Sequence, residues 1–202
     1  YEMIASLVGS EMCIRDRLGG SLYHSDYLRA WMSKLAAIQD RKIILVPGGG
    51  PFADQVRAAD QTYLLKSSHS HAMALLAMQQ FACLLSSLDN CFQSVSAIDE
   101  IHMSNCNHII WLPYDTVMQQ CDYPQNWQTT SDSLACWLAE KLQAEHLCII
   151  KSQPVHAHKL DLHQHSELLD EYFPQAVQNY RGQIYLYHAS QFELVREIIN
   201  DE

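Results

Sequence analysis

Five of the seven glycines lie in two tight clusters. One is the pair Gly19-Gly20, and the other is the triplet of residues 48–50, which follows the apolar residues 43–46 after a single proline. A glycine-rich turn between a strand and a helix lets backbone N–H groups approach a phosphate closely. Two such turns in one domain would bring two phosphate groups together, and phosphoryl transfer requires that arrangement.

Three charged residues lie close to the ends of predicted elements. Arg57 lies two turns after the glycine triplet, Lys151 directly follows an apolar strand-like run, and Asp132 lies at the start of an amphipathic segment. Each residue has a structural interpretation. Asp132 could simply favour a helix dipole, and the two cations could be solvated surface residues.

Short apolar runs alternate with amphipathic segments of helical length, which predicts an α/β sandwich with a largely parallel sheet. In such sheets ligands bind at the carboxyl ends of the strands, so the turn at Gly48, Pro113 and Lys151 should share one edge. We expect strands over residues 42–46, 108–112, 146–150 and 183–187, and helices over residues 26–39, 51–59, 69–88, 97–104, 131–144 and 191–199.

The bulk composition excludes some classes of partner. The chain has 202 residues and a net charge of −10, from 13 lysines and arginines against 23 aspartates and glutamates. This balance predicts no broad basic face for nucleic acid or an acidic membrane, but a small anionic substrate needs only a few local cations. No stretch approaches the roughly 18 apolar residues of a membrane-spanning helix. Seven cysteines without CxxC spacing predict free thiols in a reducing cytoplasm.

Three segments taken together resemble the amino acid kinase superfamily, which includes acetylglutamate, aspartate, uridylate and isopentenyl phosphate kinases. They are residues 18–22, 46–57 and 127–135, and the likeness extends over about residues 18–150. Within the superfamily the chain looks like the branch of [5-(aminomethyl)furan-3-yl]methyl phosphate kinases of methanofuran biosynthesis. Residues 71–78 add to that finer likeness.

The resemblance implies an open three-layer αβα sandwich. It also implies that ATP, with Mg²⁺, donates its γ-phosphoryl group to a small phosphate monoester. A small anionic substrate and a possible homo-oligomer are the expected partners, without nucleic acid or membrane. No side chain is assigned as a ligand of a resident metal.

The resemblance also implies the site residues. Asp132 would organise the catalytic lysines, Lys151 would lie beside the transferring phosphoryl group, and Arg17 occupies a third catalytic position. ATP phosphates would be held by Gly19, Gly20, Ser21 and Lys151, and the acceptor phosphate by Gly48, Gly49, Gly50, Asp54, Arg57 and His71. For His71, the alternative is a solvated residue at a helix start.

The first 17 residues stand apart from the rest. Residues 1–17 resemble translated sequencing-adapter sequence, so we expect a single native domain over residues 18–202; a natural extension is the alternative. Arg17 stands where the family carries a lysine, and Gln128 stands where the related branch often carries an acid. Both departures affect polar contacts of the implied site, because an arginine does not replace a lysine point charge.

Two other functions stay open at this point. One is phosphoryl transfer to a carboxylate, which an arginine fork also fits. The other is a non-catalytic nucleotide- or oxyanion-binding protein on the same fold. A separate histidine cluster could bind zinc or nickel, or could be a polar surface loop; its members are His156, His158, His163 and His165.

Overall fold

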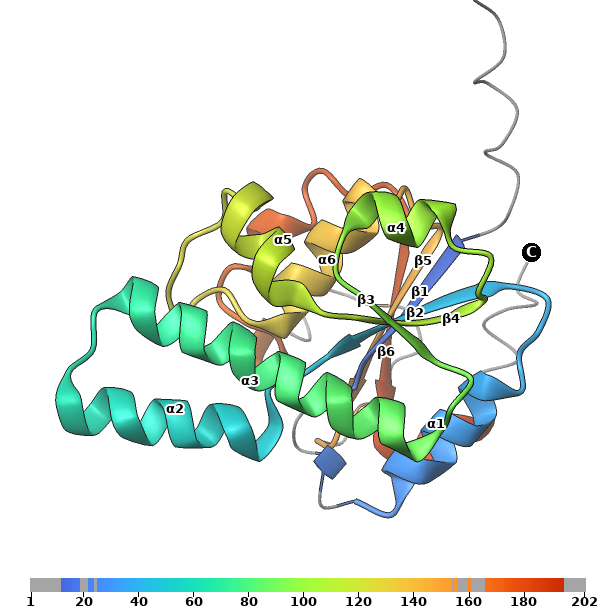
Figure 1. Cartoon of the computed structure of the whole chain (residues 1–202), viewed down its shortest axis with the longest axis horizontal. Coiled ribbons are helices and arrows are strands. Elements are labelled where there is room, and N and C mark those ends of the chain that lie inside the picture. The colour runs from blue at the N-terminus through green and yellow to red at the C-terminus, as the bar shows by residue number, and fades with distance from the viewer. Residues whose placement is uncertain are drawn as a thin grey trace, which may run out of the picture.

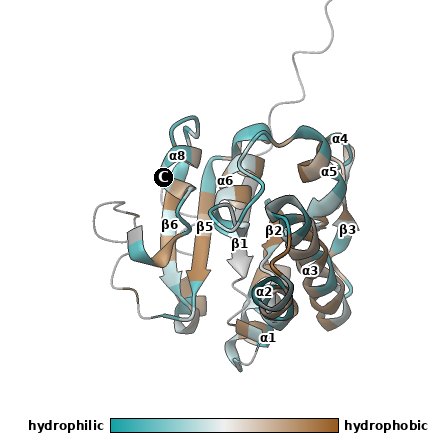
Figure 2. Cartoon of the chain, turned by 90° about the vertical axis from the view of Figure 1, so that its left-hand side faces the viewer, coloured by the Kyte–Doolittle hydropathy of each residue, from teal (hydrophilic) through white to brown (hydrophobic). Residues whose placement is uncertain are grey.

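One parallel sheet of six strands forms the centre of the chain. The computed structural model describes residues 12–18 by their backbone, and residues 22–23, 25–153, 155, 160 and 166–194. The strand order is β3-β4-β2-β1-β5-β6, and every neighbouring pair is parallel (Figure 2). The strands are β1 (Met12–Leu18), β2 (Lys42–Pro47), β3 (Gln93–Val95), β4 (His108–Trp111), β5 (His146–Lys151) and β6 (Gln183–His188).

Helices cover both faces of this sheet, and two of them, α2 and α3, form a hairpin that projects from it (Figure 1). Their bounds are α1 (Tyr27–Ala36), α2 (Gly50–Tyr63), α3 (Ser67–Leu88), α4 (Ile98–Met103), α5 (Pro113–Gln120), α6 (Ser131–Lys141) and α8 (Phe173–Ala176), with 3-10 helices η2 (Ser166–Leu168) and η3 (Ala189–Leu194).

Alternation along the buried strands builds two apolar layers. In β2, Ile44 and Val46 pack with α6, whereas Ile43 and Leu45 pack on the opposite face with α1. Such two-sided burial is typical of parallel strands between helical layers. The expected three-layer αβα sandwich with a parallel sheet is therefore confirmed.

Some elements differ from the prediction, and the reasons are local. Strand β3 has three residues, too few to show an alternation, and it was not predicted. Pro113 was interpreted as the end of a strand, but it also begins α5, because proline is favoured in the first helical turn. The helix expected over residues 191–199 is a 3-10 turn as far as Leu194, and its remaining residues lie outside the described ones.

Strand β1 lies between β2 and β5, at the centre of the sheet. Residues 15–17 of this strand are consecutively charged, whereas residues 43–47 of the neighbouring β2 are apolar, and the pairing with β2 shifts register at this point. Charges are unusual in a strand with neighbours on both sides. The proposal that residues 1–17 are not native to the domain stays a prediction.

Helix α3 is long and apolar enough to cross a membrane by length and composition, a test that core helices of soluble proteins also pass. In this chain its Phe81 and Leu85 pack in the core beside α1. The described cysteine side chains are all free thiols, as expected. Cys136 and Cys148 are buried, but Cys83 is exposed despite its apolar surroundings in the sequence.

Candidate functional site

Three strands end level with one another at the edge where the sequence predicted a site. Leu18 at the end of β1 pairs with Pro47 of β2 and with Ile150 of β5. The Gly48 turn and Lys151 therefore follow at the same level of the sheet, on either side of the end of β1. Gly19, Gly20 and Ser21 come next after β1, but they lie outside the described residues, and Arg17 is described by its backbone only.

Lys151 and Asp132 form a buried ion pair between the end of β5 and the start of α6. Lys151 follows Leu147 and Ile149 on the α6 face of β5, because side chains alternate along a strand. Its ammonium nitrogen lies 2.8 Å from Oδ2 of Asp132, and the two side chains are 9% and 2% exposed. The sequence-predicted partners are thus in direct contact, which fits the organising role predicted for Asp132.

A second carboxylate, that of Asp170, caps the same helix. Its Oδ2 accepts hydrogen bonds from the backbone N–H of Thr130 (2.9 Å), the hydroxyl of Thr130 (2.8 Å) and the backbone N–H of Ser133 (3.0 Å). Its Oδ1 accepts the Ser133 hydroxyl. Helix α6 begins at Ser131, and its N-cap residue Thr130 makes no cap bond with its own side chain.

Asp170 and Asp132 influence one another. The backbone N–H of Asp170 donates to Oδ2 of Asp132 over 3.3 Å, so the capping loop also contacts the ion pair. Burial, and then the Asp132 charge, raise the pKa of Asp170, while hydrogen bonds from Ser133 and Thr130 oppose that shift. No local pattern signals this residue, since it lies 37 positions from Ser133 in the sequence.

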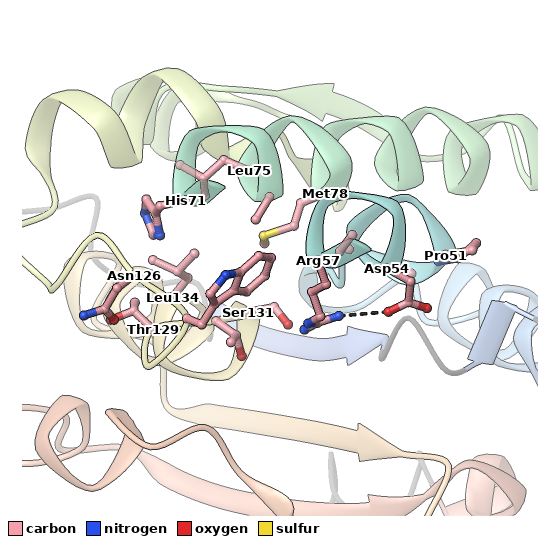
Figure 3. A pocket seen from close by; sticks show the side chains of 16 residues that line it. Pro51, Asp54, Arg57, His71, Leu75, Met78, Asn126, Thr129, Ser131 and Leu134 are labelled. Carbon is pink, nitrogen blue, oxygen red and sulfur yellow. Dashed lines mark hydrogen bonds and ion pairs between the residues drawn. The ribbon is translucent and has the colours of Figure 1, made fainter. Parts of the chain in front are cut away.

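A pocket of about 310 Å³ opens between the glycine turn, the α2–α3 hairpin and the start of α6 (Figure 3). Its volume is at the small end of ligand sites, which indicates a small ligand. Its wall is mostly apolar or neutral, with one cation and one acid. The lining residues are Gly49, Gly50, Pro51, Ala53, Asp54, Arg57, His71, Ala74, Leu75, Met78, Asn126, Trp127, Thr129, Thr130, Ser131 and Leu134.

The glycine turn fits the predicted cradle. Gly50 has a φ of 56°, a conformation that glycine adopts without strain. A Cβ atom on Gly49 would lie 2.3 Å from the Cβ of Ala53, so only glycine permits this close start of α2. Gly48 is buried at the end of β2, next to these two residues, and is not part of the pocket wall.

Arg57 lies at the mouth of the pocket with two neighbours. One of its terminal nitrogens is 2.9 Å from Oδ1 of Asp54, and its guanidinium lies 4.8 Å from the ring centre of Trp127. The indole N–H of Trp127 donates to Asp60 over 2.6 Å. Trp127 begins one of the three segments that carry the family resemblance, but it was not assigned to the site, and Asp60 was not singled out from the sequence. The hydrogen bond to Asp60 holds the Trp127 ring in place, and the Arg57 guanidinium makes a cation–π contact with that ring.

His71 lies on the other side of the pocket from Arg57 and Asp54 (Figure 3). Its side chain is buried, which lowers its pKa, and a hydrogen bond with the backbone of Asn126 opposes that shift in part. The ring is therefore uncharged near neutral pH. Of the two alternatives for His71, the solvated helix-start residue does not describe this environment.

The structure thus brings the predicted residues together in two groups. Gly49, Gly50, Asp54, Arg57 and His71 line the pocket. Asp132 and Lys151 do not line it, but Asp132 directly follows Ser131, which belongs to the pocket wall. Gln128 is exposed and donates to Glu171 over 3.0 Å. The histidine cluster of residues 156–165 lies outside the described residues, and no metal-binding group occurs among the residues that are described.

Comparisons with known proteins show the family and the fold of this chain. A curated relative from Methanocaldococcus jannaschii, [5-(aminomethyl)furan-3-yl]methyl phosphate kinase, is 26% identical over 140 residues, which cover 66% of this chain and 62% of the relative. The chain therefore spans less than two thirds of the relative's length.

Two solved structures share the fold at low identity. The uridylate kinase of Archaeoglobus fulgidus has a TM-score of 0.67 at 14% identity, with 95% of each chain covered. The aspartate kinase of Synechocystis has a TM-score of 0.65 at 13% identity, with 89% of this chain and 38% of that chain covered. The Amino acid kinase family matches residues 17–182. The family resemblance in the sequence is confirmed, and this chain belongs to the amino acid kinase family.

Proposed function

We propose that the chain is a phosphotransferase that uses ATP to phosphorylate a small phosphate monoester bound in the 310 Å³ pocket. One observation carries the proposal. The first turn of α6 supplies both the wall of an anion-compatible pocket, through Ser131, and the acid that holds a buried ammonium group, through Asp132. Phosphoryl transfer depends mainly on such positioning and on charge neutralisation.

The acceptor half is built for an anionic group. The turn at Gly49 and Gly50 opens α2, a helix of 14 residues whose free N–H groups and dipole favour an anion. Arg57 lies on the same side of the pocket, and its pairing with Asp54 is half exposed, so a ligand phosphate can replace that partner.

The donor half is supported by Lys151. A buried ammonium group at the end of β5 fits an anionic donor, and Asp132 keeps it in place next to the pocket. ATP with Mg²⁺ would supply the phosphoryl group and part of the charge neutralisation that its transfer needs. Asp132 acts here as a positioning residue, because a phosphate acceptor is already ionised and needs no general base.

For the acceptor we propose [5-(aminomethyl)furan-3-yl]methyl phosphate or a close analogue. The support is the relative's name together with the pocket: a flat indole wall at Trp127 and apolar contacts from Leu75 and Met78 suit a small ring. A cytoplasmic location is part of the same proposal.

Phosphorus NMR tests the proposal directly. The chain is incubated with ATP, Mg²⁺ and the furan phosphate, and a new diphosphate signal is expected. Lys151→Met should abolish it, whereas Lys141→Met, which removes a half-exposed lysine at the end of α6, should not. Arg17→Lys, which restores the lysine of the family, is run in parallel.

Each outcome has a consequence. If neither the chain nor Arg17→Lys forms a diphosphate while both bind ATP, the protein is a nucleotide-binding protein without this activity. If hydroxylamine instead traps an acyl phosphate from a carboxylate substrate, the acceptor class is wrong.

A further inference from the structure

The pocket has two chemically different ends (Figure 3). At one end lie Arg57 and the glycine turn, which suit a phosphate. At the other end lie His71 and Thr129, on α3 and on the loop before α6. Leu75, Met78 and Leu134 line the wall between them. A ligand that fills this pocket therefore carries an anionic end, an apolar body and a second end of different chemistry.

Thr129 is the unusual residue at the second end. Its side chain is 4% exposed, and its hydroxyl has no hydrogen-bond partner among the residues that the structure describes. Buried hydroxyl groups are nearly always hydrogen-bonded, because a desolvated and unpaired one costs free energy. Thr129 lines the pocket, but its hydroxyl oxygen is closed off from solvent in this side-chain orientation, so a bound ligand supplies the missing partner once the side chain turns about its Cα–Cβ bond.

His71 defines which kind of ligand group fits. Its ring is buried and uncharged, and its hydrogen bond with the backbone of Asn126 raises its pKa, as a ring N–H donating to a carbonyl does. An uncharged imidazole carries one N–H donor and one acceptor nitrogen. With the N–H engaged, the other nitrogen accepts a hydrogen bond from a ligand group.

The side chain of Asn126 does not compete for that group. Its Oδ1 accepts the backbone N–H of Gln128 over 2.9 Å, and its Nδ2 donates to the Gln128 side chain over 3.2 Å. The charged residues in the wall of this pocket, Asp54 and Arg57, are both at the opposite end. The second end therefore offers one acceptor nitrogen and one hydroxyl in neutral, apolar surroundings.

We propose that His71 and Thr129 select the acceptor by binding a hydrogen-bond donor, an amine or a hydroxyl, on the end opposite its phosphate. This inference rests on the proposed function, since it assumes that the glycine turn holds the phosphate. It assigns Thr129, which the sequence did not single out, as a specificity residue.

Calorimetric titration without ATP tests this selection independently of turnover. Three ligands share the furan ring and the methyl phosphate and differ at one substituent: aminomethyl, hydroxymethyl or methyl. The chain should bind the methyl compound at least about tenfold more weakly than the better of the other two, the usual effect of one lost buried hydrogen bond. Comparison of amine and hydroxyl shows which donor the pocket prefers.

Two matched pairs of variants assign the effect to the residues. Thr129→Val should remove about tenfold of the preference for the donor-bearing ligands, whereas Thr129→Ser keeps the hydroxyl and should retain it. His71→Phe should also lose the preference, and His71→Gln, which keeps an acceptor, should retain part of it. Affinity for the methyl compound should stay within about twofold in Thr129→Val.

Thermal unfolding of the ligand-free protein separates selection from a structural role. Thr129→Val removes an unpaired buried hydroxyl, so its midpoint should be equal to or above that of the original chain, even though it binds donor-bearing ligands more weakly. A structural residue would lose stability and affinity together.

The possible results are distinct. Equal binding of all three furan phosphates by the original chain overturns the inference and leaves the proposed function intact. A uniform loss across the three ligands in Thr129→Val also overturns it. If the original chain binds none of the three, the phosphate-acceptor function is wrong and this inference is wrong with it.

Discussion

Two ion pairs near the pocket have nearly the same length and opposite surroundings. Lys151 and Asp132 lie 2.8 Å apart with side chains 9% and 2% exposed, whereas Arg57 and Asp54 lie 2.9 Å apart with side chains 48% and 68% exposed. Distance alone would make them equivalent. Burial separates them, because desolvation makes a buried pair costly to build and costly to break, while solvent weakens an exposed pair.

This difference in burial suits the two ion pairs to different roles in the site. A buried pair keeps its geometry through a reaction, so Asp132 and Lys151 suit the part of the site that must be fixed before substrate arrives. An exposed pair exchanges partners at little cost, so Arg57 suits the part that must accept and release a ligand. Four predictions break or sharpen this comparison, from the largest expected effect to the smallest.

Asp132→Asn should have the largest effect. The amide keeps the size of the side chain but removes the charge beside the buried ammonium of Lys151, and breaking such a pair costs about 3–5 kcal/mol. Urea unfolding should show that loss, and the phosphorylation rate should fall by about a thousandfold or more, which corresponds to about 4 kcal/mol.

A double variant provides the control. Asp132→Leu combined with Lys151→Met removes both charges, and should recover much of the stability but none of the activity. Activity in the double variant would contradict the assigned roles of both residues.

Asp170→Ala should have the next largest effect. It removes the acceptor for two backbone N–H groups and two hydroxyls at the start of α6, and loss of such a cap costs about 1–2 kcal/mol. The measurement is again urea unfolding, together with KM for ATP.

Asp170→Asn is the matched variant. Its oxygen can keep the three bonds now made to Oδ2, and its amide can donate to the rotatable hydroxyl of Ser133. It should therefore stay close to the original stability. A loss as large as that of Asp170→Ala would show that the negative charge, rather than the cap geometry, is what matters.

Arg57→Met should affect binding rather than folding. Loss of a half-exposed pair changes the unfolding free energy by about 1 kcal/mol or less. Loss of a charge-assisted bond to the acceptor phosphate should raise KM for the acceptor by roughly tenfold or more, equivalent to about 1.5–3 kcal/mol. Steady-state kinetics at varied acceptor concentration would show it, and an unchanged KM would place the phosphate elsewhere.

Asp54→Asn should have the smallest effect. It removes the charge that pairs with Arg57, so stability should change by only a few tenths of a kcal/mol, and less still in high salt. Because the arginine then has no competing carboxylate, acceptor affinity should be unchanged or higher. A clear loss of affinity would show that Asp54 itself contacts the acceptor.

The sequence predicted the parts of this molecule that carry local signals. The glycine triplet, the apolar run before it and the strand that ends at Lys151 are each visible within a few residues. They sufficed for the parallel sheet and for the edge where the site lies. The family resemblance added the pairing of Lys151 with Asp132, which no local pattern shows.

The parts that the sequence did not predict depend on contacts between distant segments. Asp170 caps α6 from a loop far along the chain, and Asp60 orients Trp127 across 67 positions. Thr129 resembles any other threonine before a helix in the sequence, and only the folded structure shows that its hydroxyl is buried without a hydrogen-bond partner among the described residues. Folding, rather than composition, determines these properties.

The first turn of α6 has a consequence for how the reaction distance is fixed. Ser131 belongs to the acceptor pocket and its covalent neighbour Asp132 belongs to the ion pair, so one peptide bond and one ion pair of 2.8 Å connect the pocket wall to the ammonium of Lys151. Packing between domains can drift by more than an ångström, but bond lengths and helical geometry cannot. The spacing between Ser131 and Asp132 is therefore set by covalent structure, and the buried ion pair extends it to Lys151 on β5. Changes in the α2–α3 hairpin can alter what is bound without moving Lys151.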